Sequence, residues 1–300
     1  MMTTHTSRSA NLRHLASANL LALALTGPSL ATSRLPLALV SLPSSVASRR
    51  EAADSPAVRL TLEQVKAKLS STESGPPDLA NADLSGLDLT GIDFKRASLT
   101  GSRLVESKLI GANLFSCDLT DAVLTGADLS RANLDGTVLR RADFQRANLQ
   151  GASLFATIIE AADLRGANLS GTRIIGYLRS AKLAGAKLGN ANAGADPGNQ
   201  SMGVMRATFV SADLTGADLS GANLFKADFS HATLTQARLQ NVNLRNAELV
   251  QADLTKADVT GAKLAKADLF GADFTGAVGV AKIQGLDQAR NRDKAIFDAK

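Results

Sequence analysis

A bulky apolar residue returns at every fifth position through most of this 300-residue chain. The spacing runs from Leu79 to Ile174, slips once, and resumes from Phe209 to Phe274. A small residue, usually Ala, stands two positions before most of the bulky residues, and Asp or Asn is the commonest residue between them. Gly often stands two positions after the bulky residue, as in Ala167-Asn168-Leu169-Ser170-Gly171. This five-residue period constrains the fold more than any other feature of the sequence.

A period of five fits neither regular element as a continuous run. In an α-helix, five residues rotate by about 500°, so the apolar marks would spiral around the cylinder. In a continuous strand an odd period would send successive marks to opposite faces. The two-residue step from Ala to Leu does keep both side chains on one face of a short extended segment. The other three residues must then contain a turn, and repeated turns of one hand predict a stacked β-solenoid.

The A(D/N)LxG-like units from Asp78 to Ala277 resemble the pentapeptide-repeat family over about two-thirds of the chain. The resemblance implies an all-β fold, a right-handed quadrilateral β-helix with four units per coil and about nine coils. With strands stacked roughly 4.8 Å apart, such a solenoid would be about 43 Å long.

The two ends of the solenoid need covers, because open ends expose unpaired strand edges. Thr61 and Gln64 have capping-box spacing and predict an N-terminal capping helix. Leu286, Ala289, Ile296 and Phe297 have roughly helical spacing and predict a C-terminal capping helix. The segment between the two repeat blocks is rich in Gly and Asn and predicts a protruding loop. The expected divisions are an export leader (1–50), a linker with the first capping helix (51–74), the first part of the β-helix (75–188), the loop (189–206), the second part of the β-helix (207–277) and the C-terminal capping helix (278–300).

The first fifty residues contain five Arg and no Asp or Glu. Two apolar runs, 15–25 and 35–42, are too short to span a bilayer. The small residues Ser45, Val46 and Ala47 follow them and resemble a cleavage site. This pattern favours export, to the bacterial periplasm, with cleavage near Ala47. An organellar transit peptide leading to a lumen, and a cytoplasmic protein with a disordered tail or a misplaced start codon, are the alternatives.

The chemistry-bearing residues follow the repeat and do not form a catalytic constellation. The Asp residues stand at the turn-forming position before the central Leu, where they can accept hydrogen bonds from local backbone. His231 is the one histidine outside the leader, which holds His5 and His14, and it is expected at the surface. Cys117 occupies a small inward position and is expected to be a buried thiol. We therefore predict no enzyme activity, metal or cofactor.

Outward apolar residues are the candidate contact sites. With four units per coil, Phe115, Phe155 and Ile175 fall on one face, interrupted by Asp135, and Val250 and Phe270 align with each other further along. Exposed apolar stripes can mark partner sites, and protruding loops often carry function. The predicted partner surface comprises Phe115, Phe155, Ile175, Val250 and Phe270, together with Pro197, Met202 and Met205 of the loop.

Three functions remain open. The first is a non-catalytic scaffold or protein-interaction module for an unidentified protein, in which the C-terminal segment caps the β-helix or mediates a homodimer. The second is a DNA mimic that protects a type II topoisomerase, as some members of the resembled family do. The third is a solenoid hydrolase, which would need clustered carboxylates. Residues 75–277 hold 20 Lys and Arg against 21 Asp and Glu, so this near-neutral body argues against binding nucleic acid and equally against mimicking it.

Overall fold

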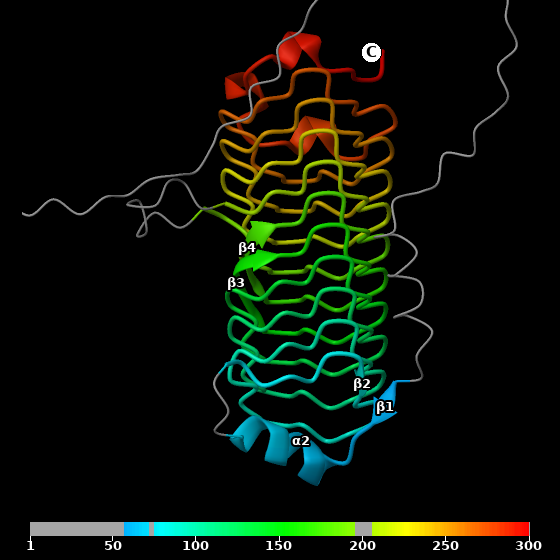
Figure 1. Cartoon of the computed structure of the whole chain (residues 1–300). Helices are drawn as coiled ribbons and strands as arrows, with labels where there is room; N and C mark the ends of the chain where they lie inside the picture. Colours follow the sequence, from blue (N-terminus) through cyan, green and yellow to red (C-terminus); the bar gives the residue numbers. More distant parts are fainter. Residues whose placement is uncertain (1–56, 72–74, 196–205, 300) are drawn as a thin grey trace, which may run out of the picture. The chain divides into compact units, whose positions relative to one another are not determined.

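The computed structural model describes residues 57–71, 75–195 and 206–299, which form a right-handed quadrilateral β-helix (Figure 1). The chain advances by one coil in twenty residues, since Asp78 pairs with Ser98 and Ser98 with Asp118, all in parallel. The predicted count of four five-residue units per coil is therefore confirmed.

Backbone hydrogen bonds join each coil to its neighbours. The N–H of Leu99 donates to the carbonyl of Asp118 at 2.7 Å, and the N–H of Gly101 to that of Thr120 at 2.9 Å. In the other direction, the N–H of Asp118 donates to the carbonyl of Ala97 at 3.2 Å. Within a unit, the N–H of Ser102 closes the turn onto Leu99 at 3.0 Å. Repetition of this pattern gives the buried backbone its partners without long strands.

The core is a column of central Leu, Ile and Phe side chains flanked by small residues, and nearly all of them are buried. Phe209 and Phe229, in successive coils, stack with ring centroids 4.6 Å apart. Ser or Thr replaces Ala at some inward positions, where the hydroxyl donates back into its own turn. Ser102, for example, donates to the carbonyl of Leu99 at 2.6 Å. These buried hydroxyls are therefore hydrogen-bonded, which removes most of the penalty for burying them.

In the regular five-residue units, the residue two positions after the central Leu or Phe adopts the left-handed conformation. Glycine often fills this corner position, as at Gly111 (φ 62°), but Arg131 (φ 58°) and Asn241 (φ 56°) hold the same place. Glycine relieves strain at such positions, yet the solenoid tolerates other residues there. The corner therefore presents variable side chains to solvent at a constant backbone geometry.

The N-terminal end is covered as the sequence predicts. Helix α2 (Leu62–Ser70) lies across the first coil (Figure 1), with Val65 and Leu69 buried against the core. Both halves of the capping box between Thr61 and Gln64 are present. Just before α2, strand β1 (Val58–Arg59) pairs in parallel with β2 (Ala82–Asp83). Within the described ranges, no helix is long and apolar enough to cross a membrane.

The C-terminal end differs from the single capping helix predicted for 278–300. It contains three 3-10 helices, η2 (Val280–Lys282), η3 (Leu286–Gln288) and η4 (Arg292–Lys294). Left-handed residues at Gly279, Gly285 and Asn291 precede the three turns and prevent one continuous helix. Between these turns, the chain continues to pair with the coil below. The segment is therefore a last, six-residue version of the solenoid, whose paired positions are Val278, Gln284, Arg290 and Ile296.

The slip after Ile174 is a four-residue unit. Here β4 (Arg173–Tyr177) pairs in parallel with β3 (Ser153–Ile158), and the register shifts between Phe155 and Thr157. A Cβ added to Gly176 would lie 2.5 Å from the carbonyl oxygen of Thr157, so only glycine fits this close approach. At this corner the chain runs extended where other units turn.

The predicted boundary of the loop at 189 is wrong. Residues 189–195 continue the solenoid, with Ala193 buried at a central position. The N–H of Ala193 donates to the carbonyl of Asn223 at 2.8 Å, and Asn192 pairs with both Arg173 and Asn223. The five-residue period continues through Ala193, but a small residue holds the position that a bulky residue usually fills. The sequence pattern therefore did not identify this unit. The remaining residues of the predicted loop that lie at 196–205 fall outside the described residues.

Candidate partner-binding surface

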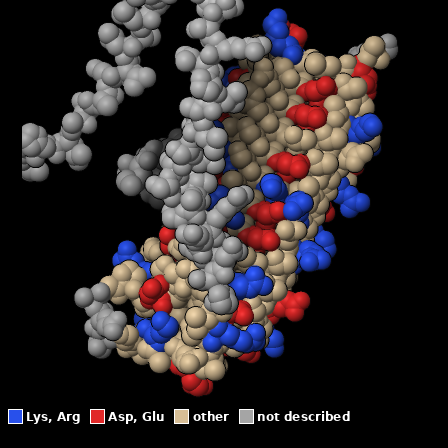
Figure 2. All heavy atoms as spheres, turned by 45° about the vertical axis from the view of Figure 1, so that its right-hand side comes forward, with Lys and Arg blue, Asp and Glu red and all other residues tan. Residues whose placement is uncertain are grey.

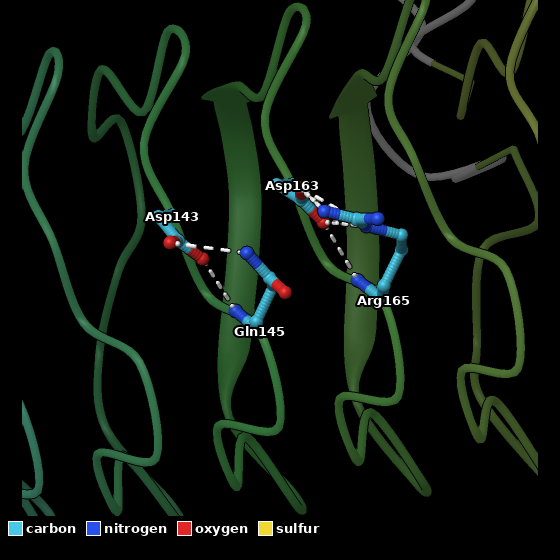
Figure 3. Close-up of polar contacts among 4 residues, drawn as sticks. All are labelled: Asp143, Gln145, Asp163 and Arg165. Carbon is cyan, nitrogen blue, oxygen red and sulfur yellow. Dashed lines mark hydrogen bonds and ion pairs between the residues drawn. The ribbon is translucent and has the colours of Figure 1, made fainter.

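Many Asp and Asn side chains that precede a central residue accept hydrogen bonds within their own turns. Figure 3 shows two neighbouring coils in which Asp143 accepts from the backbone N–H of Gln145 at 2.9 Å and Asp163 from that of Arg165 at 3.2 Å. The side chain of Gln145 also reaches Asp143, and the guanidinium of Arg165 approaches Asp163 to 2.6 Å. The predicted turn-forming role of these carboxylates is confirmed at these positions.

Contacts of this kind lower the pKa values of the turn carboxylates Asp163 and Asp218. Burial alone would raise the pKa of Asp163, but hydrogen bonds from Arg165 outweigh it and hold that pKa below its ordinary value. Burial likewise opposes the hydrogen bonds from Ser220 that lower the pKa of Asp218. A general acid for glycoside hydrolysis needs the opposite shift, a raised pKa. These two carboxyl groups are therefore poorly suited to that role.

The outward side chains do not form a surface that is acidic throughout or basic throughout. Asp83, Asp143 and Asp163 lie on one face, but the pairing places Arg103 and Val123 between the first and second of them. On the face shown in Figure 2, Lys and Arg side chains are interspersed with Asp and Glu. The alternation of charge along a row follows from the sequence, because residues twenty apart stack directly.

Two of the predicted apolar contact residues are exposed. The side chains of Phe115 and Phe270 remain 48% and 46% exposed. Phe155 is half-buried, because the guanidinium of Arg173 lies over its ring, 4.3 Å from the centroid. Val250 is half-buried too.

The prediction that Ile175 is an outward contact residue is wrong. It is only 2% exposed. The four-residue unit runs extended through this corner as part of β4, so Ile175 does not take the outward position that a five-residue turn would give it. The pairing of Arg173 with Asn192 then places Gly194 and Ala195 over it in the next coil. The continuous stripe from Phe115 through Phe155 to Ile175 is therefore interrupted.

The structure adds an apolar column that the sequence analysis missed. Val138, Ile158 and Tyr177 occupy the paired position of three successive coils, where Asp or Asn is usual. Tyr177 is 59% exposed, and the other two are half-buried. The signal was available in the sequence, because these residues stand immediately before Leu139, Ile159 and Leu178. We call this column, together with Phe115 at the corner that precedes it and Phe270 at the corner that follows it in other coils, the apolar contact surface.

The structure also shows the environment of the cysteine and the histidine considered in the sequence. Cys117 is a buried free thiol, and burial raises its pKa to about 12, so it is protonated at neutral pH. His231 is exposed at a left-handed corner, as predicted. Pro197, Met202 and Met205 lie outside the described residues. Among the residues that are described, no group of His, Cys, Asp and Glu could hold a metal ion.

Arg206 forms a charged network that the sequence analysis did not single out. Its guanidinium binds both carboxylate oxygens of Glu248, at 2.8 and 3.1 Å, and reaches Asp228 at 3.1 Å. The hydrogen bonds with Glu248 raise the pKa of Arg206. The network ties the residue just before the second part of the β-helix to the next two coils.

Sequence comparison identifies the class of protein. Residues 78–114, 117–154, 205–241 and 237–276 match the family described as pentapeptide repeats (8 copies). HetL, a pentapeptide repeat protein involved in heterocyst differentiation regulation in the cyanobacterium Nostoc sp. strain PCC 7120, is 32% identical. That match covers 71% of this chain and 92% of HetL, with a TM-score of 0.48. The chain belongs to the pentapeptide-repeat family.

Two further solved structures are more distant. QnrB1, a plasmid-mediated fluoroquinolone resistance protein, is 18% identical, with 68% of this chain and 88% of QnrB1 covered and a TM-score of 0.27. A pentapeptide repeat protein from the Arabidopsis thaliana thylakoid lumen is 25% identical, with 55% and 88% covered and a TM-score of 0.17. Comparison with curated proteins found no match.

Proposed function

We propose that the protein is a non-catalytic scaffold that binds a protein partner through the apolar contact surface. The observation that carries this proposal is the exposure of Tyr177, Phe115 and Phe270 on a solenoid whose other large apolar side chains are mostly buried. Aromatic residues are enriched where proteins bind one another, because they supply large contact areas. The rigid coils hold these side chains at set spacings, so little order would need to be gained on binding.

The charge distribution supports a protein partner over nucleic acid. Tyr177 follows Val138 and Ile158 in its column, while the next corner position holds Arg140, Glu160 and Arg179 in the same coils. An apolar strip bordered by mixed charges resembles the core and rim of a protein interface. A surface for phosphates would instead gather cations.

The test is quantitative affinity purification of the tagged full-length protein from its own cells, with Phe115→Ser and Tyr177→Ser combined. We expect the partner recovered with the wild type to be depleted at least about tenfold, equivalent to about 1.4 kcal/mol. Lys95→Ser is a matched control, because Lys95 holds the corner position of Phe115 one coil earlier. Equal recovery from the double variant and the control would reject this surface.

Protection of a type II topoisomerase is the second candidate function, and its basis is that QnrB1 is a fluoroquinolone resistance protein. The mixed rows of charge weigh against it. Addition of the purified protein to a gyrase supercoiling assay, with and without a fluoroquinolone, tests the idea directly. Absence of both inhibition and protection would reject it.

We also propose that the protein is exported, with residues 1–50 as a cleaved leader. The support is the acid-free, Arg-containing sequence with two short apolar runs. Intact-mass measurement and N-terminal sequencing of natively expressed protein, with cell fractionation, test this proposal. Loss of about 47 residues and recovery outside the cytosol are expected for export to a periplasm-like compartment. A full-length cytosolic protein would reject it.

A further inference from the structure

A basic pocket lies at one corner of the last coils. It has a volume of about 410 Å³ and is lined by Arg206, Lys226, Asn246, Glu248, Lys266 and Arg290. That volume is in the range of pockets that hold small molecules. Four cations therefore line a pocket that contains one carboxylate.

Three of the lining residues form a column with a common backbone geometry. Lys226, Asn246 and Lys266 hold the left-handed corner position of three successive coils, with φ values of 60°, 58° and 61°. Their N–H groups donate to the carbonyls of Arg245, Ala265 and Gln288 of the coil above. The repeat thus sets the two lysines two coils apart, with an amide between them.

The carboxylate in the lining is already committed. Both oxygens of Glu248 accept from Arg206, which also reaches Asp228, so Arg206 is shared between two carboxylates and offsets only one of their two charges. Arg290 lies 3.6 Å from a carboxylate oxygen of Asp268, a distance too long for a strong charge-assisted bond. Its guanidinium keeps donors that can serve a ligand.

The two lysines lack such partners. Over residues 57–71, 75–195 and 206–299, no carboxylate lies within ion-pair distance of the ammonium group of either Lys226 or Lys266. The ammonium of Lys226 instead lies over the ring of Phe225, 5.4 Å from its centroid. Lysine is a mobile point charge that suits phosphate and carboxylate groups.

We propose that this pocket binds a small anion with two or more negative charges, of the phosphate or polycarboxylate class. Lys226 and Lys266 supply the charge, Arg290 supplies guanidinium donors, and the Asn246 amide donates between the lysines. Arg206 shapes the wall and reduces the repulsion between Glu248 and the ligand. This proposal is independent of the proposed partner binding.

The experiment is isothermal titration of the full-length protein with pyrophosphate and, separately, with citrate, at low and matched ionic strength. Low salt is needed because an open site is screened strongly. We expect one site per chain for at least one of the two anions. Pyrophosphate binding assigns phosphate chemistry, and citrate binding assigns carboxylate chemistry. Failure of both to bind would overturn the proposal.

The variant Lys226→Gln with Lys266→Gln should weaken binding at least about tenfold, equivalent to about 1.4 kcal/mol. Lys266→Arg should retain binding, because it retains the charge. Lys256→Gln is the matched control, since Lys256 is also exposed and left-handed (φ 57°) but lies outside the lining. Lys266→Gln is also measured alone, so that each of the two variants removes one charge. If Lys256→Gln weakens binding as much as Lys266→Gln alone, the attraction is diffuse and the pocket is not a site. An unchanged melting temperature excludes unfolding as the cause.

Discussion

The body of the solenoid and its C-terminal end solve the same stacking problem with different unit lengths. In the body, five residues make one side of the coil, and the central Leu or Phe is buried. At the end, the paired residues Val278, Gln284, Arg290 and Ile296 are six apart. Both lengths keep parallel pairing with the coil below. Parallel pairing between coils therefore tolerates a change in the length of the turn that joins two sides.

The sixth residue changes how well the interior is filled. It converts the corner into a 3-10 turn, and residues such as Val280, Ile283 and Leu286 pack against the core only in part. This suits a terminal coil, which has a neighbour on one side only. The five-residue unit combines pairing with full burial, and the six-residue unit combines pairing with partial burial.

The largest expected effect contrasts two aromatic stacks. Phe229 stacks on Phe209 inside the body, whereas Phe297 stacks on Phe274 at the end, with centroids 5.0 Å apart. Phe229→Ala should lower the free energy of unfolding by about 3–5 kcal/mol, because it leaves a cavity in a packed column. Phe297→Ala should cost clearly less, since Phe297 is only half-buried. Denaturant titrations followed by circular dichroism measure both, and equal losses would contradict the comparison.

A second test exchanges the corner residue in the two regions. A Cβ at Gly279 (φ 80°) would lie 2.7 Å from the Cα of Thr260, so Gly279→Asn should destabilise the protein by about 1–3 kcal/mol. A Cβ at Gly111 would meet nothing within 4 Å, and Asn241 already holds the equivalent position. Gly111→Asn should therefore change stability by less than about 0.5 kcal/mol. Thermal unfolding distinguishes the two, and a reversed order would show that the terminal turn is adaptable.

The third test uses pH, because the body has Asp turns and the six-residue end has none at its paired positions. The pKa of Asp218 lies below its unfolded value, near 3.8, so its contribution is present above that pH and is lost as pH falls through the lower folded value. The melting temperature should drop over this interval. The substitution Asp218→Asn should lower the melting temperature at neutral pH. It should also make the fall of the melting temperature at acidic pH smaller.

Asparagine is a fair replacement there, because Asn148 and Asn168 occupy the same position in other coils and make the same turn hydrogen bond. If the melting temperature of Asp218→Asn falls as much at acidic pH as that of the wild type, the pH dependence belongs to other groups.

The smallest expected effect concerns the exposed aromatic residues. Phe115→Ser should alter the free energy of unfolding by less than about 0.5 kcal/mol, because its ring is half in solvent. Lys95→Ser in the same column should do likewise. A loss above about 1 kcal/mol for Phe115→Ser would mean that this ring stabilises the solenoid, and partner depletion could no longer be assigned to a lost contact.

The period of the body could be predicted from the sequence because each position has one repeated task. Leu or Phe fills the axis, Ala admits a close neighbour, and Asp or Asn accepts from the turn. The C-terminal coil was not predicted, because its period changes to six and apolar residues such as Leu286 and Ala289 keep a spacing compatible with a helix. The recurrence of Gly279, Gly285 and Asn291 at six-residue intervals was the overlooked signal.

The surface was harder to predict than the fold. Phe115 and Phe270 were found because an outward position in a regular unit stays outward. Ile175 was misplaced because the four-residue unit changes the path of the corner, and a fixed period cannot describe that change. Tyr177 was missed because its position was assigned to turn-forming Asp and Asn. The basic pocket was hidden for another reason: Arg206 and Arg290 come from segments that do not follow the five-residue frame.

The constant cross-section of the coil has a consequence for how such a chain can evolve. A duplication of twenty residues inserts one complete coil. Away from the insertion, every existing residue keeps its neighbours in the coils on both sides. Because the side chains at the corner are not needed for pairing, the new coil can then acquire its own pattern of charge and apolar groups. Gene length and binding repertoire can thus grow together, without redesign of the interior.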